Sequence, residues 1–359
     1  MKKSYHVIGL MSGTSLDGLD IVFCQISQDK KKYTYEILKT KSVDYSPKMK
    51  SDLKNAIHLS ALEILKLNNT YGTWLGEQAK VFIEEQNLKV DFIASHGHTT
   101  HHQPKKGVTY QIGSGQHLAN ASNHMVINDF RTQDVALGGQ GAPLVPIGDL
   151  LFFRDYTFCL NLGGISNISF QKNKQRIAYD IGLANMVLNY ITQKIDLAYD
   201  SNGDLARSGS VNPTLLEQLN ELEFYKLPHP KSIGYEWFLK EVAPLLDATQ
   251  DSIPNLLHTA VLHICQQISI QVKENVKTKN NSLLVTGGGA LNTFLVDTLK
   301  RELQNTATII IPSKTVIEFK EALIFGLMGF LRLENKINVL RSVTGATKDS
   351  CSGVMYLPQ

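Results

Sequence analysis

A short turn near the start of the chain carries several groups that could bind a phosphate. It reads Ser12-Gly13-Thr14-Ser15-Leu16-Asp17-Gly18 and lies between two apolar runs. Its glycines allow backbone N–H groups to approach an anion, and its hydroxyls add donors. Asp17 could hold Mg²⁺ through water, as is common at metal-phosphate sites. The turn therefore indicates a phosphate site, although a solvent-exposed hairpin turn explains the same residues.

A second glycine-rich turn, Gly287-Gly288-Gly289, follows the apolar run at 282–286. Three glycines between a strand and a helix allow a flat base or a phosphate to lie against the backbone, and tight packing of strand on helix is the alternative. The chain contains no GxxxxGK[ST] sequence, and this turn lacks the third glycine of a dinucleotide fingerprint. Both common nucleotide signatures are therefore excluded.

Four histidines, at positions 96, 98, 101 and 102, follow the apolar run at 90–94. No thiolate or carboxylate accompanies them, so a polar loop at a strand end is favoured over a metal site. Such a loop could still contact a substrate, because ligands gather at the carboxyl ends of strands. Arg131 follows the next strand in the same way, and a surface ion pair with Asp129 or Asp134 is the alternative. The glycine-rich stretch 138–143 suits a hinge or a loop pressed against a ligand.

Asp180 is the strongest candidate for a catalytic carboxylate. It is expected at the end of a strand, before Gly182 and a helix, which is where a general base facing a cleft belongs. Aspartate is also a good helix N-cap. The residues alone leave both interpretations open.

Two hairpins with similar turns organise the elements that must position these residues. Strands are expected over 5–11, 19–26 and 33–45, then over 90–94 and 124–130, with a helix through 71–83. The pattern restarts with 158–162, a turn at 163–167, and strands at 168–170 and 176–180. It continues with a helix at 184–195, a strand at 282–286, a helix from Leu291, a strand at 308–311, a helix at 318–333 and a short strand in the tail. The repetition predicts a duplicated α/β fold with a boundary near 131–157.

The composition indicates which classes of protein and which cellular compartment fit this chain. The 359 residues include 36 Lys and Arg against 33 Asp and Glu, a net charge of +3 that requires neither nucleic acid nor an anionic membrane. The four cysteines are scattered, which is typical of a reducing compartment. The apolar run at 7–11 is too short for a signal peptide, and no run approaches a membrane span. We therefore expect a cytoplasmic protein.

Taken together, the motifs resemble those of the anhydro-N-acetylmuramic acid kinases. The matching segments run from residue 9 to about residue 346. They are Gly9–Asp20, His96-Gly97-His98-Thr99, Gln111-Ile112-Gly113, Asp129-Phe130-Arg131, Gly138–Pro146, Asn161–Asn167, the glycines at 287–289 and Glu321-Ala322. Two positions depart from the family pattern: His98 replaces a glutamine, and Leu183-Ala184 replaces a Pro-Gly pair after Asp180.

The resemblance implies two actin-like (ribonuclease H-like) α/β domains with a nucleotide cleft between them. We expect an N-terminal domain over 1–131 with the phosphate loop and part of the sugar site, and a C-terminal domain over 132–359 with the catalytic aspartate and the adenosine site. The implied reaction converts 1,6-anhydro-N-acetylmuramic acid, ATP and water into N-acetylmuramic acid 6-phosphate and ADP, in the recycling of cell-wall peptidoglycan. A kinase of the same fold for an ordinary hexose or amino sugar, and an ATP-binding sensor without chemistry, are the alternatives.

The resemblance also implies roles for individual residues. Asp180 would be the general base, and ATP and Mg²⁺ the cofactors, with the metal held near Asp17 or Asp20 through water. The nucleotide would contact Gly13, Thr14, Ser15, Leu16, Asp17, Gly18, Leu19, Asp20, Gly163, Gly164, Gly287, Gly288 and Gly289. The sugar would contact His96, His98, Arg131 and Glu321. A homodimer is compatible with the sequence, which leaves the oligomeric state open.

Overall fold

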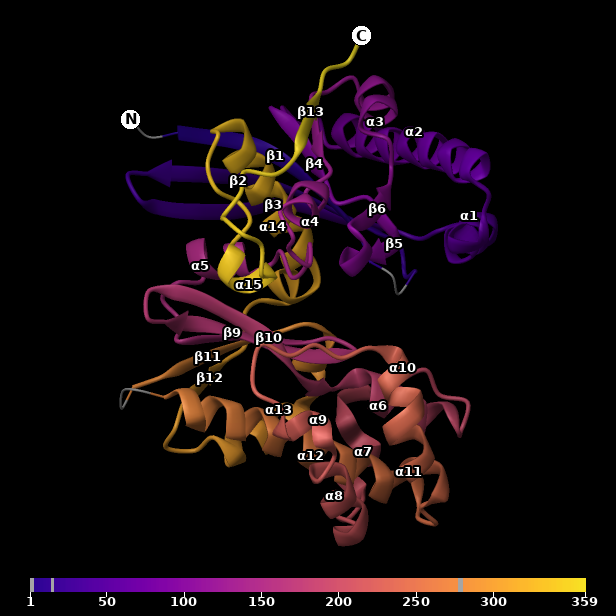
Figure 1. Ribbon diagram of the computed structural model, residues 1–359, viewed down its shortest axis with the longest axis vertical. Coiled ribbons are helices and arrows are strands. Elements are labelled where there is room, and N and C mark those ends of the chain that lie inside the picture. The colour runs from indigo at the N-terminus through magenta and orange to yellow at the C-terminus, as the bar shows by residue number, and fades with distance from the viewer. Residues whose placement is uncertain (1–2, 14–15, 277–279) are drawn as a thin grey trace. The chain divides into compact units, whose positions relative to one another are not determined.

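The computed structural model describes residues 3–13, 16–276 and 280–359, and its chain forms two compact units (Figure 1). One unit contains Met1–Phe153 and Phe319–Gln359, and the other contains Arg154–Glu318. The expected boundary at 131/132 differs from this division, because α4 (Thr132–Ala136), α5 (Pro146–Leu151) and the last 41 residues belong with the first unit. The apolar side chains of α14 (Lys314–Leu333) explain the return of the chain, since they complete the core of the first unit.

The first unit is built on a six-stranded sheet in the order β13-β7-β4-β1-β2-β3. Strands β1, β2 and β3 form an antiparallel meander, β4 and β7 continue parallel to β1, and β13 closes the edge antiparallel to β7. The six strands are β1 (Lys3–Ser12), β2 (Leu19–Asp29), β3 (Lys32–Val43), β4 (Phe92–Ser95), β7 (Val126–Asn128) and β13 (Val354–Tyr356). All six were expected from the sequence, with small differences at their ends.

A separate two-stranded ribbon and several helices complete the first unit. The ribbon pairs β5 (His98–Gln103) with β6 (Val108–Ile112), so the segment expected to be a polar loop after His96 is a strand from His98. Pairing with β6 gives the polar side chains a partner that local hydrophobicity does not reveal. The helices are α1 (Pro47–Asn55), η1 (Ala56–His58), α2 (Ala61–Glu85), η2 (Pro104–Lys106), α3 (Gly115–Ser122), α4 (Thr132–Ala136), α5 (Pro146–Leu151), α14 (Lys314–Leu333) and α15 (Arg341–Thr344).

The first sheet has an apolar core on each face, because its central strands β1, β2, β4 and β7 are buried on both sides. Val7 of β1 packs in one core with Leu323 and Leu327 of α14, whereas Ile8 packs in the other with Tyr71 and Leu75 of α2. Side chains of successive residues point to opposite faces of a strand, so one strand serves both cores. Gly9 allows α14 to approach closely, since a Cβ there would lie 2.0 Å from the Ala322 carbonyl oxygen.

The second unit repeats the same strand arrangement in a five-stranded sheet, in the order β10-β9-β8-β11-β12. An antiparallel meander is again followed by two strands parallel to its first strand. The strands are β8 (Phe158–Leu162), β9 (Ile165–Lys172), β10 (Gln175–Leu183), β11 (Ser282–Thr286) and β12 (Thr308–Ile310). The predicted duplication of an actin-like α/β fold is thereby confirmed, although the second hairpin turn is shorter than expected because β9 already begins at Ile165.

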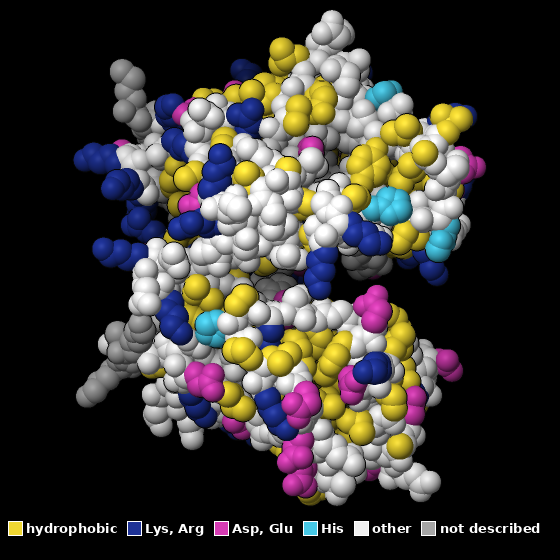
Figure 2. Space-filling view, in the orientation of Figure 1, with side chains coloured by type: hydrophobic (Ala, Val, Ile, Leu, Met, Phe, Trp, Pro, Cys, Tyr) yellow, Lys and Arg dark blue, Asp and Glu magenta, His cyan; other side chains and the backbone are white. Residues whose placement is uncertain are grey.

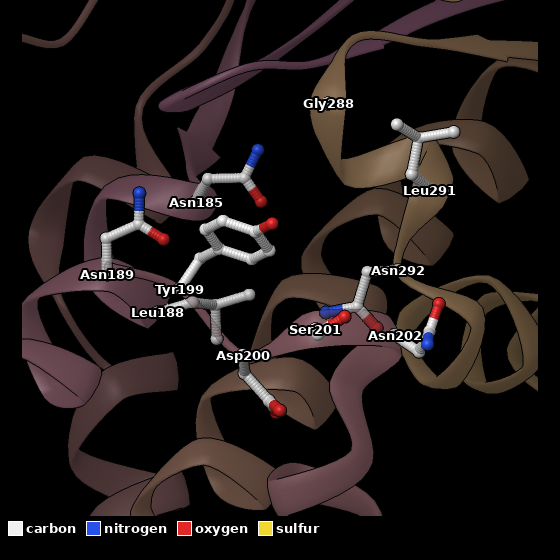
Figure 3. Close-up of a pocket in the computed structure, with 10 residues that line it drawn as sticks. All are labelled: Asn185, Leu188, Asn189, Tyr199, Asp200, Ser201, Asn202, Gly288, Leu291 and Asn292. Atoms are coloured by element: carbon white, nitrogen blue, oxygen red, sulfur yellow. The ribbon is translucent and has the colours of Figure 1, made fainter. Parts of the chain in front are cut away.

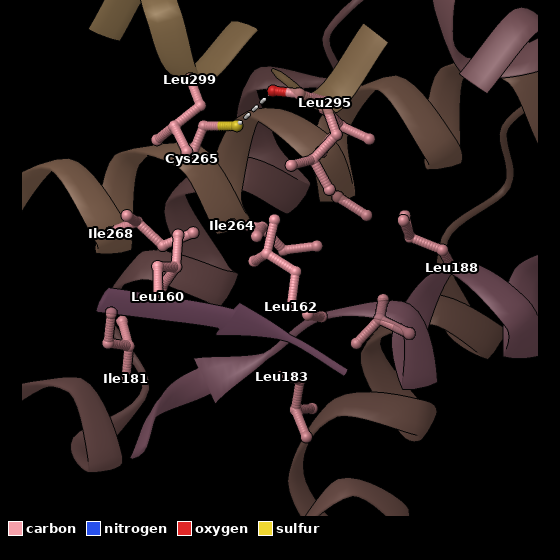
Figure 4. Close-up of a cluster of buried hydrophobic side chains, with 14 of the residues drawn as sticks. Leu160, Leu162, Ile181, Leu183, Leu188, Ile264, Cys265, Ile268, Leu295 and Leu299 are labelled. Atoms are coloured by element: carbon pink, nitrogen blue, oxygen red, sulfur yellow. Dashed lines mark hydrogen bonds between the residues drawn. The ribbon is translucent and has the colours of Figure 1, made fainter. Parts of the chain in front are cut away.

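Helices pack around the second sheet and enclose one large core (Figure 4). Leu160 and Leu162 of β8 meet Ile264 and Ile268 of α12 there, and the Cys265 thiol donates to the Leu295 carbonyl oxygen over 3.5 Å. The helices are α6 (Asn185–Gln193), η3 (Ser201–Gly203), α7 (Asp204–Ser208), α8 (Pro213–Asn220), α9 (Glu223–Lys226), α10 (Tyr235–Trp237), the π-helix η4 (Phe238–Val242), α11 (Ala243–Ala248), α12 (Ile253–Asn275), η5 (Gly288–Leu291) and α13 (Thr293–Glu302). The helix expected from Leu291 begins at Thr293, because Asn292 caps it by accepting from the Leu295 N–H.

Surface charge is locally uneven on the face shown in Figure 2. Lys and Arg side chains gather at the edge of the first unit near the β2–β3 turn, where Lys30, Lys31 and Lys32 are exposed. The visible face of the second unit carries charges of both signs. Within the part of the chain that the structure describes, no helix combines the length and the apolar character needed to span a membrane.

Candidate active site

The turn between β1 and β2 holds most of the expected phosphate ligands. Strand pairing ends with Ser12 opposite Leu19, and inside the turn the Leu16 N–H donates to the Gly13 carbonyl oxygen over 3.3 Å. Thr14 and Ser15 lie outside the described residues. Gly18 is required by close packing, since a Cβ there would lie 2.5 Å from the Val43 carbonyl oxygen. The Leu19 side chain is fully buried, so only its backbone can face a ligand.

One carboxylate lies within this turn and another just after it, and the two differ in how they are held. Asp17 is exposed, whereas Asp20 is half-buried and accepts a hydrogen bond from Ser42 over 2.7 Å. Carboxylate oxygen is a suitable ligand for Mg²⁺, which commonly keeps several waters. No group of three or more His, Cys, Asp or Glu residues suited to a metal ion occurs among the described residues. A metal at this turn would therefore complete its shell with water and phosphate oxygens.

Behind the turn, a chain of buried polar groups ends at His98. The Tyr45 hydroxyl donates to Ser12 Oγ over 2.6 Å and lies 2.8 Å from the Tyr71 hydroxyl, while Ser12 Oγ lies 3.0 Å from His98 Nδ1. Desolvation lowers the pKa of His98 to about 4, so its ring is neutral near pH 7. The Ser12 hydroxyl is thus committed to this chain.

His96 and Arg131 come from the ends of neighbouring strands and bind each other. Arg131 Nε donates to His96 Nε2 over 2.9 Å, and the other ring nitrogen, Nδ1, lies 2.9 Å from the Gly97 carbonyl oxygen. Desolvation, with the positive charge of Arg131, holds the pKa of His96 well below its usual range. The expected alternative of an ion pair between Arg131 and Asp129 or Asp134 is not formed. The guanidinium instead bonds His96 and the Gly141 carbonyl oxygen.

Arg131 interacts electrostatically with Glu321 on α14. Burial lowers the pKa of Arg131 to about 10, and the negative charges of Glu321 and Asp134 oppose that shift. The pKa of Glu321 is raised, chiefly by desolvation and further by Asp20, with Arg131 and Lys320 acting in the opposite direction. More than a third of the Glu321 surface nevertheless remains accessible to water, so protein atoms crowd this carboxylate without covering it.

The glycine-rich loop after Arg131 is pressed against a buried aspartate. Asp134 is fully buried and accepts hydrogen bonds from the Gly141 N–H over 2.8 Å and from the Thr344 hydroxyl over 2.7 Å. A Cβ at Gly139 would lie 2.2 Å from an Asp134 carboxylate oxygen. The loop is therefore tied to the first unit at a point that also presents the Gly141 carbonyl to Arg131.

Asp180 lies within β10, which continues to Leu183 past a bulge between Asp180 and Gly182. Its Oδ2 accepts from Ser232 Oγ over 2.9 Å and from the Ile233 N–H over 3.0 Å. The following helix, α6, has Ala184 at its N-cap position, so Asp180 is not a helix cap. Desolvation raises the pKa of Asp180, and its two hydrogen bonds oppose the shift.

The second hairpin turn is a pair of glycines that meets the start of α6. The Gly163 carbonyl oxygen accepts from the Asn185 N–H over 3.1 Å, and the Gly164 carbonyl oxygen accepts from the Ala184 and Met186 N–H groups over 2.8 and 3.1 Å. The turn thus uses its carbonyls to satisfy helix donors. Among the described residues, no backbone carbonyl accepts from the N–H groups of Gly163 and Gly164.

The three glycines after β11 form part of the wall of a cavity of about 430 Å³ (Figure 3). Gly287 has φ +79°, and a Cβ there would lie 2.7 Å from Asn161 Oδ1; at Gly289 a Cβ would lie 2.7 Å from the Leu162 Cβ. Gly288 faces the cavity. The cavity is lined by Asn185, Leu188, Asn189, Tyr199, Asp200, Ser201, Asn202, Gly288, Leu291 and Asn292. Exposed apolar faces of Tyr199 and Leu291 with amides from four asparagines suit a flat heterocycle.

The structure groups the sequence-predicted residues into two sets. The first unit brings together the 13–20 turn, His96, His98, Arg131 and Glu321, and the second contains Asp180, Gly163, Gly164 and Gly287–Gly289. Sequence reasoning missed Tyr45, Tyr71, Asn185, Tyr199, Ser232 and Asn292. Asn185 had a signal, because it stands in the motif that contains Asp180. The others lie in segments without a motif.

Comparison with known proteins adds three findings. A family model described as anhydro-N-acetylmuramic acid kinase matches residues 5–358. Proteins of that name from Bacillus thuringiensis subsp. konkukian (strain 97-27) and Bacillus cereus (strain AH820) are each 31% identical over 98% of this chain and 99% of their own length. The solved activator of 2-hydroxyisocaproyl-CoA dehydratase from Clostridium difficile, with bound ADPNP, aligns at 12% identity over 92% of this chain and 96% of its own, with a TM-score of 0.43.

Proposed function

This chain belongs to the anhydro-N-acetylmuramic acid kinase family, and from that premise we propose that it opens 1,6-anhydro-N-acetylmuramic acid with water and phosphorylates O6 at the expense of ATP. The products are N-acetylmuramic acid 6-phosphate and ADP. Neither an ordinary hexose kinase nor a non-catalytic ATP sensor is favoured by the family match. The observation that carries the proposal is the carboxylate of Asp180, which serves no helix cap and has one oxygen held by two donors.

Asp180 acts as the general base in this reaction. It takes one proton from a water molecule, whose oxygen forms a bond to the anomeric carbon on the face opposite the anhydro bridge. The bond between the anomeric carbon and O6 breaks, and its electron pair stays on O6. O6 then forms the new bond to the γ-phosphorus, and ADP leaves. No carboxylic acid needs to protonate the departing oxygen, because the phosphoryl group captures it.

Each unit has a glycine turn that suits phosphate. In the first unit, the 13–20 turn offers backbone N–H groups, and in the second, Gly163 and Gly164 direct their carbonyls to α6 and keep their N–H groups for a ligand. Mg²⁺ would be held by Asp20, with Asp17 near it, through water. A bound Mg²⁺ neutralises charge on the phosphates during transfer.

The cavity behind Gly288 is the proposed adenosine site. Tyr199 is 66% exposed and Leu291 is 43% exposed. Each side chain can therefore cover a face of the base without losing contacts in an apolar core. The amides of Asn185, Asn189 and Asn292 can pair with the donors and acceptors of the base or the ribose.

The sugar is assigned to the polar groups around Arg131. His98 and Glu321 are our candidates for its hydroxyl and acetamido groups. Arg131 is our candidate for its lactyl carboxylate, because guanidinium pairs with carboxylate in two parallel hydrogen bonds. His96, whose ring nitrogens bond Arg131 and Gly97, would serve the sugar site by orienting Arg131. The protein would act in the cytoplasm, where ATP is supplied, in the recycling of cell-wall fragments, and a homodimer is its proposed assembly.

A substrate panel tests the reaction directly. The purified protein is given ATP with 1,6-anhydro-N-acetylmuramic acid, N-acetylmuramic acid or N-acetylglucosamine, and ADP release is measured. Of the three sugars, we expect only the anhydro sugar to be turned over. In labelled water, ¹⁸O should appear at the anomeric carbon of the product. Faster turnover of an ordinary sugar would support the hexose-kinase alternative, and ATP binding without any turnover would support the sensor.

A further inference from the structure

The two oxygens of the Asp180 carboxylate have different surroundings within the second unit. Oδ2 accepts from Ser232 Oγ and from the Ile233 N–H. Oδ1 has no hydrogen-bond partner among the described residues. A carboxylate with one oxygen held by two donors cannot rotate freely, so Oδ1 remains the oxygen without a protein donor.

The segment 231–233, which carries Ser232, is held both by Asp180 and by residues of α9. The Asp180 N–H donates to the Lys231 carbonyl oxygen over 3.1 Å, so backbone and side chain of Asp180 both bind this segment. Lys231 Nζ donates to the carbonyl oxygens of Phe224 and Tyr225 over 3.0 and 3.3 Å, and it also lies 4.6 Å from the centre of the Phe224 ring. These contacts hold the segment against α9.

Tyr225 supports the bulge that follows Asp180. Its ring lies so close to Gly182 that a Cβ there would be 2.6 Å from Cε1. Its hydroxyl is hydrogen-bonded to the Leu183 backbone and lies 2.9 Å from Nε2 of the buried His263. Nδ1 of His263 lies 2.7 Å from Asn220 Oδ1, which links the bulge to α8 and α12.

From this geometry we propose that Ser232 is a positioning residue for the proposed base: its hydroxyl, with the Ile233 N–H, binds Oδ2 of Asp180 and leaves Oδ1 as the oxygen that receives the proton from water. The inference rests on the proposed function, because it requires Asp180 to be the base. It adds to that function the residue that decides which carboxylate oxygen reacts.

The position of Ser232 also has a consequence for the pH dependence. Hydrogen bonds to the ionised carboxylate lower its pKa, so they keep more of the base ionised at a given pH. The titratable groups near Asp180 in this unit are Tyr179 on β10, Tyr225 on α9, His229 and Lys231 in the segment itself, and Glu274 on α12. None of their charges contributes appreciably to the pKa of Asp180, so desolvation and the two donors set it.

The experiment compares Ser232→Ala and Ser232→Thr with the wild type from pH 5 to pH 9, by ADP release with the anhydro sugar. We expect Ser232→Ala to lower kcat about 3- to 10-fold at the plateau and to move the acidic limb of the profile up by roughly half to one pH unit. Activity at pH 5 should fall by more than activity at pH 8. Ser232→Thr, which keeps the hydroxyl, should restore the wild-type limb.

Controls distinguish positioning from a general effect on the fold. Ser208→Ala removes an exposed hydroxyl that donates to the Leu205 carbonyl oxygen, and it should leave both kcat and the limb unchanged. Thermal unfolding of each variant checks that the second unit is intact. If Ser232→Ala does not fold, Ser232→Cys replaces it, because a thiol is a weaker donor and should place the limb above that of the wild type.

A double-mutant cycle with Asp180→Asn gives the decisive outcome. If Ser232 acts through Asp180, adding Ser232→Ala to Asp180→Asn should cost no further activity. The same cost in both backgrounds, or an unmoved limb in every folded Ser232 variant, would overturn the inference while leaving Asp180 as the base. Near-normal turnover by Asp180→Asn alone would instead overturn the base and with it the proposed function.

Discussion

The two hairpins that open the two units share a topology and differ in their turns. In the first, β1 and β2 are joined by residues 13–18, and the Ser12 hydroxyl at the base of the turn belongs to a buried chain that includes His98. In the second, β8 and β9 are joined by Gly163 and Gly164 alone, and their carbonyls accept from the first residues of α6. The same strand arrangement thus has a long turn in the first unit, next to buried polar side chains, and a short turn in the second unit, hydrogen-bonded to the start of α6.

The difference suits the two turns to different ligands. The long turn contains the exposed Asp17 and is followed in β2 by the half-buried Asp20, and such carboxylates suit a metal with phosphates. The short turn joins β8 directly to β9. The next strand, β10, has a bulge between Asp180 and Gly182. Desolvation acts alike in both units: it lowers the pKa of His96 and His98 in the first unit and of His263 in the second, and it raises the pKa of Asp180.

The largest effect is expected from Asp180→Asn. Asparagine cannot accept the proton of water, so the rate should fall by about 10² to 10⁴, and sugar cleavage and phosphorylation should fall together. ATP binding, measured by calorimetry, should persist. Asp196→Asn changes an exposed carboxylate of the same unit and should keep the wild-type rate. An Asp180→Asn variant with near-normal turnover would remove the functional contrast between the units.

A substitution at Gly287 should have the next largest effect. Alanine there would combine φ +79° with a Cβ 2.8 Å from the Leu162 backbone, so we expect a loss of about 1–3 kcal/mol in the free energy of unfolding and about 10-fold weaker ATP binding. Urea unfolding and calorimetry measure the two quantities. Gly288→Ala is the matched control for stability, because its nearest neighbour would be Asn185 Nδ2 at 3.8 Å. Equal stability of both variants would contradict the assignment of strain to Gly287.

His98, one of the buried histidines of the first unit, makes stability depend on pH. The pKa of His98 is about 4 in the folded protein, below the unfolded value near 6.5, so the unfolded chain binds the proton first as pH falls. Stability is therefore complete above about pH 6.5 and is lost towards pH 4, by about 3 kcal/mol from this residue. His98→Gln, which introduces the residue typical of the family, should reduce that loss in urea unfolding at pH 7 and pH 4.5. His58→Gln, at an exposed position, should keep the wild-type difference, and an unchanged pH dependence in His98→Gln would assign the loss to other residues.

The smallest effect is expected at Gly164, and it tests the comparison between the hairpins themselves. A Cβ at Gly164 would have its nearest neighbour, Met186 Cε, at 3.8 Å, so Gly164→Ala should change the free energy of unfolding by less than about 0.5 kcal/mol. Gly18→Ala in the first hairpin should cost more, because its Cβ would meet the Val43 carbonyl oxygen at 2.5 Å. Thermal unfolding of the two variants side by side decides the point. A larger loss at Gly164 would mean that the shorter turn is the more constrained one.

Much of the fold and part of the candidate site could be predicted from the sequence. Apolar runs such as 5–11 and 282–286 identified strands, and the glycine turns between them identified both hairpins, because strand periodicity and turn preferences are properties of neighbouring residues. The same local signals marked Asp180, Arg131 and Gly287–Gly289 as candidates. The ribbon of β5 and β6 was missed, since a strand of polar residues is stabilised by its partner and not by its own pattern.

What the sequence determined by itself is therefore the set of elements, the duplicated order of strands and the family. The tertiary structure alone decided which distant residues meet. Ser232 reaches Asp180 across 52 positions, Tyr45 reaches Ser12 across 33 and His98 reaches Ser12 across 86, and the chain returns at Phe319 to complete the first core. These pairings depend on how the sheets order their strands and on which helix covers each face, and such long-range contacts leave no period or spacing in the residues themselves.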